Sequence, residues 1–178
     1  MTRREKNPNL TKAHEGVNVT IQVGDEIPTV EIVAIEKGEA TKIKTSEILG
    51  KGKVVLFGVP GAFTPTCSDY HLPGFVIRSE ELKAKGVDKV FCVSVNDPFV
   101  MKAWGESQGI GDEVTLLADG NCEFAAATGL VLDAHDSVMG NRSRRYAAIL
   151  QDGVVTALEV EPAGGLTVSS AESILEKL

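Results

Sequence analysis

The stretch Phe57–Ser68, FGVPGAFTPTCS, places one cysteine, Cys67, between a threonine–proline step and the start of a predicted helix. A free thiol is mostly protonated at neutral pH, whereas the thiolate is the reactive nucleophile. The first turn of a helix favours negative charge because its N–H groups are unpaired there. The basic run Arg142-Ser143-Arg144-Arg145 enters the last predicted hairpin and can bring a guanidinium to the same edge. Cys67 is therefore the candidate nucleophile.

Thr64 lies three residues before Cys67, and the residue type at this position distinguishes disulfide exchange from peroxide reduction. A disulfide exchanger would carry a second cysteine there, to resolve a mixed disulfide. A lone thiolate with a hydroxyl and an arginine nearby instead suits two-electron attack on a peroxide, in which the sulfur becomes a sulfenic acid and the donors stabilise the departing oxygen. Pro60 and Pro65 stiffen the loop and help to exclude water and larger oxidants.

The apolar patterns around Cys67 predict alternating strands and helices. Short β-branched runs, typical of strands buried on both faces, cover residues 53–59, 89–95 and 114–118. Residues 17–36 predict two short strands, and Asp152-Gly153 indicates a hairpin of residues 146–150 and 154–160. Helices are predicted near 45–49, over 66–85 with Pro73 as a kink, after the cap Asn96-Asp97-Pro98, near 121–128 and in the terminal SSAESILEKL.

This order of elements predicts an α/β fold with a central mixed sheet. Alternating strands and helices give a parallel sheet covered by helices, and the hairpin adds antiparallel strands to it. Such sheets bind ligands beyond the carboxyl ends of their strands. Cys67 follows the predicted strand 53–59 by a short loop, which places it at that edge.

Composition predicts one domain over residues 17–178, preceded by a tail over residues 1–16. The chain has 178 residues, of which 43% are hydrophobic, and this suffices for a full core. The formal charge of −7 argues against a nucleic-acid partner, because an acidic domain repels phosphate backbones. No apolar run reaches the roughly 18 to 20 residues that span a bilayer, so no membrane association is predicted.

Cysteine usage and the first residues bear on the compartment. Three widely spaced cysteines do not form a disulfide scaffold, so a reducing compartment is predicted, namely the cytoplasm, with an organelle matrix left open. The start, MTRREKNPNLTKAHEG, is basic and hints at an organelle presequence. Its two glutamates argue against one, because such segments contain few acids, and a solvated tail is favoured. No His, Cys or Asp spacing indicates a zinc site.

The pattern Pro60-x-x-x-Thr64-x-x-Cys67 matches the active-site pattern of the peroxiredoxins. The fuller run GVPGAFTPTCSDYHLPGF, with FCVSVNDPFVMKAW after it, resembles the type II, or peroxiredoxin-five, group, and GNRSRRYAAILQDGVVTALEVEP resembles the closing hairpin of that group. The resemblance implies a thioredoxin-like fold and a homodimer. It also implies reduction of hydrogen peroxide and organic hydroperoxides with no metal and no organic cofactor.

The resemblance also assigns roles to single residues. Cys67 is the peroxidatic thiol, Thr64 positions the peroxide, and Pro60 shields the pocket. Arg145 matches the arginine that holds thiolate and peroxide, and the backbone N–H of Cys67, with that of Gly61, completes an oxyanion-type site.

The chain departs from some members of this group at the resolving cysteine. Val168 stands where a late cysteine would resolve the sulfenic acid. Cys92 matches the second cysteine of plant-type members, but it lies inside a predicted buried strand, where a small core residue is the favoured interpretation and a resolving role is the alternative. Cys122 matches no family role. We therefore expect a one-cysteine cycle, reset by glutathione with glutaredoxin or, alternatively, by thioredoxin.

Several assignments have two interpretations from sequence alone. His71, four residues after Cys67, either touches substrate and tunes the thiolate or packs beside the pocket. Gly61, Phe63 and His71 are the candidates for lining the substrate pocket. Phe63, Phe99 and Trp104 are usual core residues, although Phe63 and the segment from Asp97 to Trp104 can also face a partner subunit. Arg142 and Arg144 can simply face water, since a run of charged residues is usually solvated. Side chains alternate along a strand, so Arg144 and Arg145 face opposite ways and only one of them can point at the pocket. Finally, the thiol can serve a redox sensor or binding module instead of an enzyme.

Overall fold

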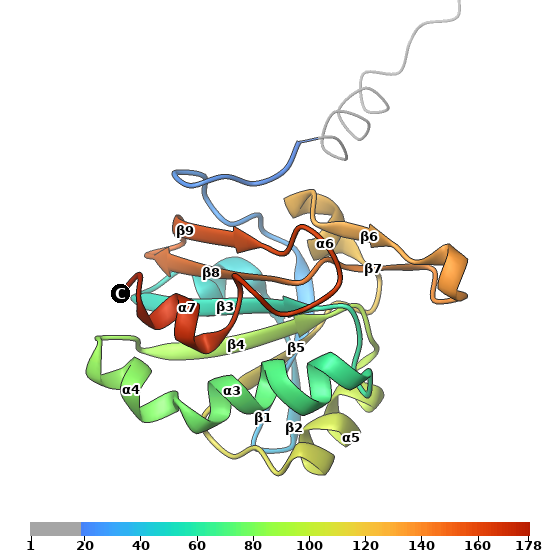
Figure 1. The fold of residues 1–178 in the computed structure, drawn as a ribbon, viewed down its shortest axis with the longest axis horizontal. Helices are drawn as coiled ribbons and strands as arrows, with labels where there is room; N and C mark the ends of the chain where they lie inside the picture. Colours follow the sequence, from blue (N-terminus) through green and yellow to red (C-terminus); the bar gives the residue numbers. More distant parts are fainter. Residues whose placement is uncertain (1–18) are drawn as a thin grey trace, which may run out of the picture.

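The computed structural model describes residues 19–178, and its centre is a seven-stranded sheet of order β2-β1-β5-β4-β3-β8-β9 (Figure 1). The predicted tail, residues 1–16, lies outside the described residues. The strands of this sheet are β1 Glu31–Glu36, β2 Glu39–Lys44, β3 Lys53–Val59, β4 Lys89–Ser94, β5 Thr115–Ala118, β8 Tyr146–Gln151 and β9 Val154–Val160. A separate antiparallel pair joins β6 Val131–Asp133 to β7 Asn141–Ser143 and projects from one end of the molecule.

The middle of the sheet is parallel and its margins are antiparallel. Strands β5, β4 and β3 run parallel to one another, whereas β1 pairs antiparallel with β5, and β8 pairs antiparallel with β3. Strand β3 is buried along almost its whole length, as a strand covered on both faces must be. The carboxyl ends of the parallel strands thus share one edge of the sheet, which is the edge that the sequence predicts for chemistry.

Helices cover both faces of the sheet, and the side-chain alternation of β3 divides the core between them. Val55, Phe57 and Val59 pack with residues of α3 Leu72–Ile77, α4 Ser79–Ala84, α5 Pro98–Gln108 and α7 Ala171–Leu175. Val54 and Leu56 face the other layer, with residues of α2 Thr45–Leu49 and α6 Glu123–Thr128. The thioredoxin-like arrangement of a mixed sheet between helical layers is confirmed (Figure 1).

Local sequence rules located most of the elements. Strand β3 has the predicted bounds, and β4, β5, β8 and β9 differ from prediction by a residue or less. Asp97 caps α5 by accepting from the Val100 N–H at 2.9 Å, and Ser170 caps α7 in the same way through Ser173. The hairpin turn places Asp152 and Gly153 at positive φ, as an Asp-Gly turn requires.

Two predictions about elements were wrong, and three strands were not predicted, whereas the second of the two strands expected in residues 17–36 is present as β1. In residues 19–30 there is no strand but a single bridge from Glu26 to Val154, and the chain is held by separate bonds such as that from the Gly24 N–H to the Val155 carbonyl. The long helix over 66–85 is broken at Arg78, between α3 and α4. Strands β2 and the β6–β7 hairpin were not predicted, because their residues are largely exposed and lack the apolar alternation of a half-buried strand.

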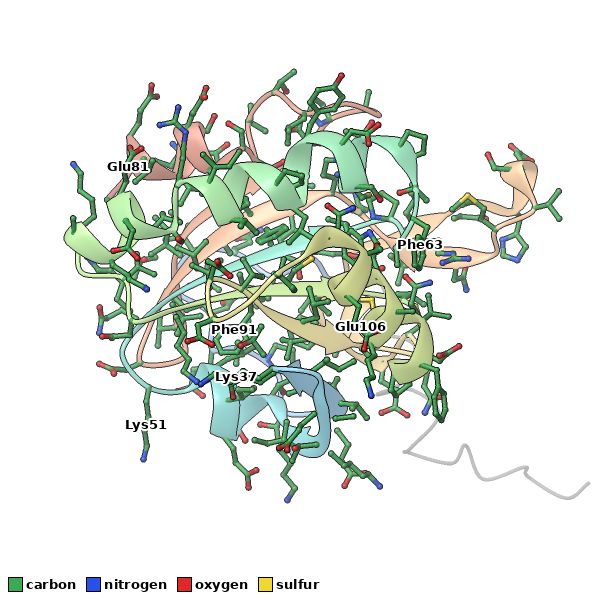
Figure 2. The ribbon with its side chains drawn as sticks, turned by 90° about the horizontal axis from the view of Figure 1, so that it is seen from below. Lys37, Lys51, Phe63, Glu81, Phe91 and Glu106 are labelled. Carbon is green, nitrogen blue, oxygen red and sulfur yellow. The ribbon has the colours of Figure 1, made fainter. Side chains whose placement is uncertain are left out.

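Of the three aromatic residues near the site for which the sequence left two interpretations, only Trp104 belongs to the core. Trp104 is fully buried, but Phe63 is 56% and Phe99 is 85% exposed. Phe63, which is labelled in Figure 2, adopts a left-handed backbone conformation at φ 63°. Within residues 19–178, no helix combines the length and apolar character needed to cross a bilayer.

Candidate active site

Cys67 lies where the loop after β3 turns into the helical segment that covers the sheet. It begins a π-helical turn, Cys67–His71 (η1), in which the Leu72 N–H donates to the Cys67 carbonyl. Such wide turns are uncommon and often mark functional sites. The side chain of Cys67 is completely buried.

Strand register brings Arg145 to this cysteine. Strand β8 pairs with β3 so that Tyr146 lies opposite Gly58, near the carboxyl end of β3. A Cβ at Gly58 would clash with the Tyr146 ring, so glycine is needed for the two strands to pair here. Arg145, directly before Tyr146, then donates from Nη2 to Cys67 Sγ at 3.1 Å.

His71 lies between Arg145 and the C-terminal segment. Its Nδ1 is 3.0 Å from Arg145 Nη1, and its Nε2 is 2.8 Å from the Ser169 carbonyl oxygen. A guanidinium can only donate, so Nδ1 must accept and Nε2 must carry the proton. The pKa of His71 is lowered from 6.5 to about 3. Burial is the largest cause and the charge of Arg145 acts in the same direction, whereas the hydrogen bond to Ser169 and the charge of Glu161 act in the opposite direction. The imidazole is therefore neutral at physiological pH.

The loop between β3 and η1 closes on itself through short hydrogen bonds. The Thr64 hydroxyl donates to the Gly61 carbonyl at 2.7 Å, and the Ser68 N–H donates to the Thr64 carbonyl at 3.0 Å. The described bonds of the Thr64 side chain thus lead to the loop and not to the sulfur. Gly61 is buried, and a Cβ there would crowd the Thr64 methyl group at 3.1 Å. Phe63 is more than half exposed to solvent.

A cavity of about 240 Å³ opens beside Arg145. Half-buried Pro60 forms one wall, which places this proline between the cavity and the segment that leads to Cys67. The residues that line the cavity are Pro60, Leu132, Arg144, Arg145, Glu161, Pro162, Ala163 and Gly164. It has room for a small substrate, and one of its lining residues, Arg145, also contacts the sulfur.

The other two thiols lie in different surroundings. Cys92 lies in β4 opposite Phe57 of β3 and is completely buried. Burial raises its pKa strongly, the nearby Cys67 raises it further, and Arg145 acts in the opposite direction. Cys122 is half-buried before α6, and all three cysteines are free. Val168 is half-buried and donates its N–H to Glu161 at 2.8 Å.

Two residues around the site were missed from sequence. Glu161 is buried and connects the end of β9 to Ser169, whose carbonyl contacts His71. The sequence carried one hint, since Glu161 stands before Pro162 at the end of a predicted strand whose neighbours are apolar. Nothing in the sequence indicated Ser169, because its role depends on its backbone oxygen.

Comparison with known proteins gives the class of this chain. Residues 22–175 match the Redoxin family. The chain is 51% identical to Peroxiredoxin-2E-2, chloroplastic, of Oryza sativa subsp. japonica, over 91% of this chain and 74% of that protein. It is 50% identical to Peroxiredoxin-2B of Arabidopsis thaliana, over 89% and 98% of the two chains. The crystal structure of reduced Prx3 in complex with H2O2 from Vibrio vulnificus superposes with a TM-score of 0.83 at 47% identity, covering 89% of this chain and 99% of that one.

These matches span nearly all of the described residues and agree with the site geometry. The chain belongs to the redoxin family and, within it, to the peroxiredoxins of the type II, peroxiredoxin-five group, and it is a thiol peroxidase. The buried thiol Cys67, with Arg145 as its hydrogen-bond donor, is the candidate site for this activity.

Proposed function

We propose that this peroxiredoxin reduces hydrogen peroxide and organic hydroperoxides through a one-cysteine cycle with Cys67 as the peroxidatic thiol. The observation that carries the proposal is the 3.1 Å hydrogen bond from Arg145 Nη2 to the buried Cys67 Sγ. A guanidinium is a charged donor, so at this distance it can stabilise negative charge at the site of the reaction. The Vibrio vulnificus relative, whose structure contains H2O2, supports a peroxide as the substrate.

In the first half of the cycle the thiolate attacks the terminal oxygen of the hydroperoxide. A lone pair of the sulfur forms the S–O bond, and the O–O bond breaks. The electron pair leaves on the hydroxide or alkoxide, which takes a proton from water. Cys67 is oxidised to a sulfenic acid and the hydroperoxide is reduced to water or an alcohol. Arg145 stabilises the charge that moves from sulfur to the departing oxygen, as preorganised donors do in other enzymes.

The loop residues complete the site in this proposal. Thr64 positions the peroxide, because its hydroxyl oxygen can still accept from the peroxide O–H while it donates to Gly61. The backbone N–H groups of Cys67 and Gly61 are the further donors. Pro60, at the wall of the cavity beside Arg145, shields the sulfur from water. His71 holds Arg145 and does not itself contact the peroxide.

The second half of the cycle needs an external thiol. One thiol attacks the sulfenic sulfur, forming a mixed disulfide and releasing water, and a second thiol attacks that disulfide and returns Cys67 to the reduced state. Glutathione with glutaredoxin is the favoured donor and thioredoxin is the alternative. The burial of Cys92 in β4 and the presence of Val168 support an external donor, because neither position offers an accessible thiol.

The same two observations also favour a second candidate function, a redox sensor in which a partner reads the oxidation of Cys67. A sensor needs the peroxide step but no rapid reset. It therefore differs from the enzyme only in the fate of the sulfenic acid.

Stopped-flow oxidation followed by turnover assays tests the cycle. Trp104 is the single tryptophan, and its Nε1 donates to Ser68, the residue after Cys67, at 3.0 Å, so its fluorescence reports oxidation. We expect rapid oxidation by hydrogen peroxide, none in Cys67→Ser, and turnover with glutathione and glutaredoxin that is largely kept in Cys92→Ser. Rapid oxidation with no donor able to restore Cys67 would establish the sensor. A Cys67–Cys92 disulfide found by mass spectrometry would contradict the one-cysteine cycle.

We propose that the enzyme is a homodimer that uses the exposed aromatic side chains near the active-site loops. Phe63 and Phe99 are 56% and 85% exposed, and large exposed apolar side chains are candidates for burial at an interface. Sedimentation of the wild type and of Phe99→Glu tests this. We expect a dimer that the charged residue weakens, and a monomeric wild type would refute it.

For the location we propose the cytoplasm. The three free cysteines support a reducing compartment, and the chloroplastic name of the rice relative keeps an organelle matrix as the alternative. A fluorescent fusion of the full chain, imaged in its native cells, separates the two.

A further inference from the structure

Glu161 is a buried carboxylate for which the proposed chemistry has no use. It follows β9 and is only 4% exposed. Its Oε1 accepts hydrogen bonds from the N–H groups of Thr167, Val168 and Ser169 and from the Ser169 hydroxyl, and its Oε2 accepts from the Thr167 hydroxyl, all at 2.7 to 3.0 Å. Burial alone would raise its pKa, but these hydrogen bonds lower it from 4.5 to about 2. The carboxylate is therefore ionised at physiological pH.

Glu161 is connected to the thiol from two sides. Its backbone N–H donates to the Arg145 carbonyl at 2.9 Å, which continues the β8–β9 pairing by one residue. Its side chain holds Ser169, whose carbonyl oxygen is 2.8 Å from His71 Nε2. His71 Nδ1 in turn lies 3.0 Å from Arg145 Nη1, and Arg145 Nη2 contacts Cys67.

The segment between these contacts has no regular structure of its own. Residues 161–170 include Gly164 and Gly165, the latter at φ 135°. The C-terminal end of this segment is fixed by the start of α7. The carboxylate of Glu161, at the N-terminal end of the segment, holds the backbone of residues 167–169 in place. If it is lost, the Ser169 carbonyl is free to turn away and His71 loses the acceptor that keeps its proton on Nε2.

We propose that Glu161 is a positioning residue for Cys67. Through the Ser169 carbonyl it holds His71 as the neutral Nε2–H tautomer, so that the lone pair of Nδ1 faces Arg145 and keeps Nη2 of the guanidinium on the sulfur. This inference rests on the proposed function, in which Arg145 assists the attack on peroxide.

Asp119 provides a matched control elsewhere in the molecule. It is also a buried carboxylate, 2% exposed, and it accepts from the backbone N–H groups of Phe124 and Ala125 at 3.0 and 2.9 Å. None of its described hydrogen bonds leads to Arg145, His71 or Cys67. Replacing it with asparagine removes the same kind of charge from the same kind of backbone site.

The test compares Glu161→Gln with Asp119→Asn in two measurements. The first is the rate constant for oxidation of Cys67 by hydrogen peroxide, and the second is the ¹⁵N chemical shifts of the His71 imidazole, which report its tautomer. For Glu161→Gln we expect the rate constant to fall about tenfold, because small misplacements of catalytic groups have effects of this order, and the shifts to leave the pure Nε2–H pattern. For Asp119→Asn we expect neither change.

A second variant keeps the proposal testable if Glu161→Gln does not fold. Thr167→Val combined with Ser169→Ala removes both hydroxyl donors to Glu161 and leaves every backbone bond in place. We expect a smaller change in the same direction in both measurements. Wild-type rates with unchanged His71 shifts, in whichever of the two variants folds, would refute the inference, and so would an equal loss in Asp119→Asn. If the wild-type thiol does not react with peroxide, the proposed function fails, whereas the His71 shifts still test the positioning.

Discussion

Cys67 and Cys122 occupy similar places in the fold but have opposite electrostatic surroundings. Each follows a parallel strand of the central sheet, β3 or β5, at its carboxyl end, and each lies at the start of a helical segment. Arg145 lies 3.1 Å from Cys67 Sγ. Burial raises the pKa of Cys122, and the Asp119 carboxylate raises it further. Position at the sheet edge is therefore not enough, and the charge supplied by other segments decides which thiol is suited to nucleophilic attack.

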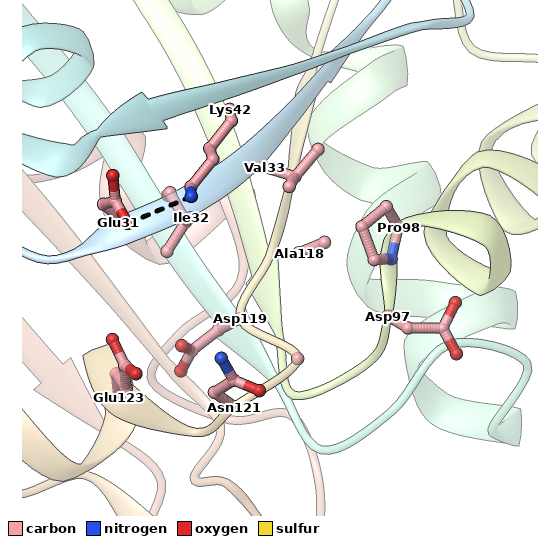
Figure 3. Close-up of a pocket in the computed structure, with 11 residues that line it drawn as sticks. Glu31, Ile32, Val33, Lys42, Asp97, Pro98, Ala118, Asp119, Asn121 and Glu123 are labelled. Atoms are coloured by element: carbon pink, nitrogen blue, oxygen red, sulfur yellow. Dashed lines mark ion pairs between the residues drawn. The ribbon is translucent and has the colours of Figure 1, made fainter.

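The cavity near Cys122 shows the same contrast (Figure 3). It has a volume of about 360 Å³ and lies between β1, β5 and the start of α5. The acidic side chains that line it are Glu31, Asp97, Asp119 and Glu123, and Lys42 pairs with Glu31 at 3.3 Å. An anionic leaving group would meet repulsion there, whereas the cavity beside Arg145 is lined by two arginines, Arg144 and Arg145, and one carboxylate, Glu161.

The largest expected effect comes from removing the charge that distinguishes Cys67. Arg145→Ala should lower the rate constant for oxidation by peroxide by about 10² to 10³, the usual loss when one preorganised donor is removed. Stopped-flow Trp104 fluorescence measures it. Arg78→Ala is the control, because Arg78 pairs with Glu81 and Glu172 at the surface. A wild-type rate in Arg145→Ala would show that the guanidinium is not what separates the two thiols.

The sequence could predict a candidate thiol and the loop that carries it, but not the groups that are connected to it through the backbone. The Thr64-x-x-Cys67 pattern and the strand 53–59 are local, so they could be predicted without a structure. Arg145 stood out from its neighbours only by the resemblance to a family. The contacts of Glu161 and Ser169 depend on an irregular segment and on a carbonyl oxygen, and neither leaves a pattern in the sequence. The β6–β7 hairpin was missed for a related reason, because its strands are short and mostly exposed.

An intermediate effect is expected on stability in acid, where the two regions respond in opposite directions. His71 has a pKa of about 3 in the folded protein and 6.5 when unfolded, so the unfolded chain binds more protons between these values and stability falls as the pH drops through that window. Glu161 adds a loss between 4.5 and about 2. The pKa of Asp119 is raised, mainly by burial, so its cost to the folded state disappears as it becomes protonated.

Urea unfolding near pH 7 and near pH 4.5 measures this effect. The titration of His71 alone should remove about 2 to 3 kcal/mol from the free energy of unfolding over this interval. Glutamine at position 71 does not titrate and can still accept from Arg145 and donate to Ser169. Between pH 7 and pH 4.5, the free energy of unfolding of His71→Gln should therefore fall by about 2 to 3 kcal/mol less than that of the wild type. An equal loss in both proteins would mean that His71 does not carry the acid sensitivity of the Cys67 region.

The smallest expected effect concerns the reactivity of Cys122. Cys67→Ser, in which Cys122 is the one thiol that is not fully buried, gives the background for alkylation with iodoacetamide at neutral pH. Adding Asp119→Asn removes the negative charge beside Cys122, so its pKa should fall and alkylation should become faster by a few-fold, since only the thiolate reacts. Cys122→Ser in the otherwise wild-type chain should leave peroxide turnover unchanged, as the control for a thiol without a catalytic role. Slower or unchanged alkylation would show that exposure, and not the carboxylate, sets the reactivity of Cys122. Charge would then no longer explain why only one of these two similarly placed cysteines is suited to attack peroxide.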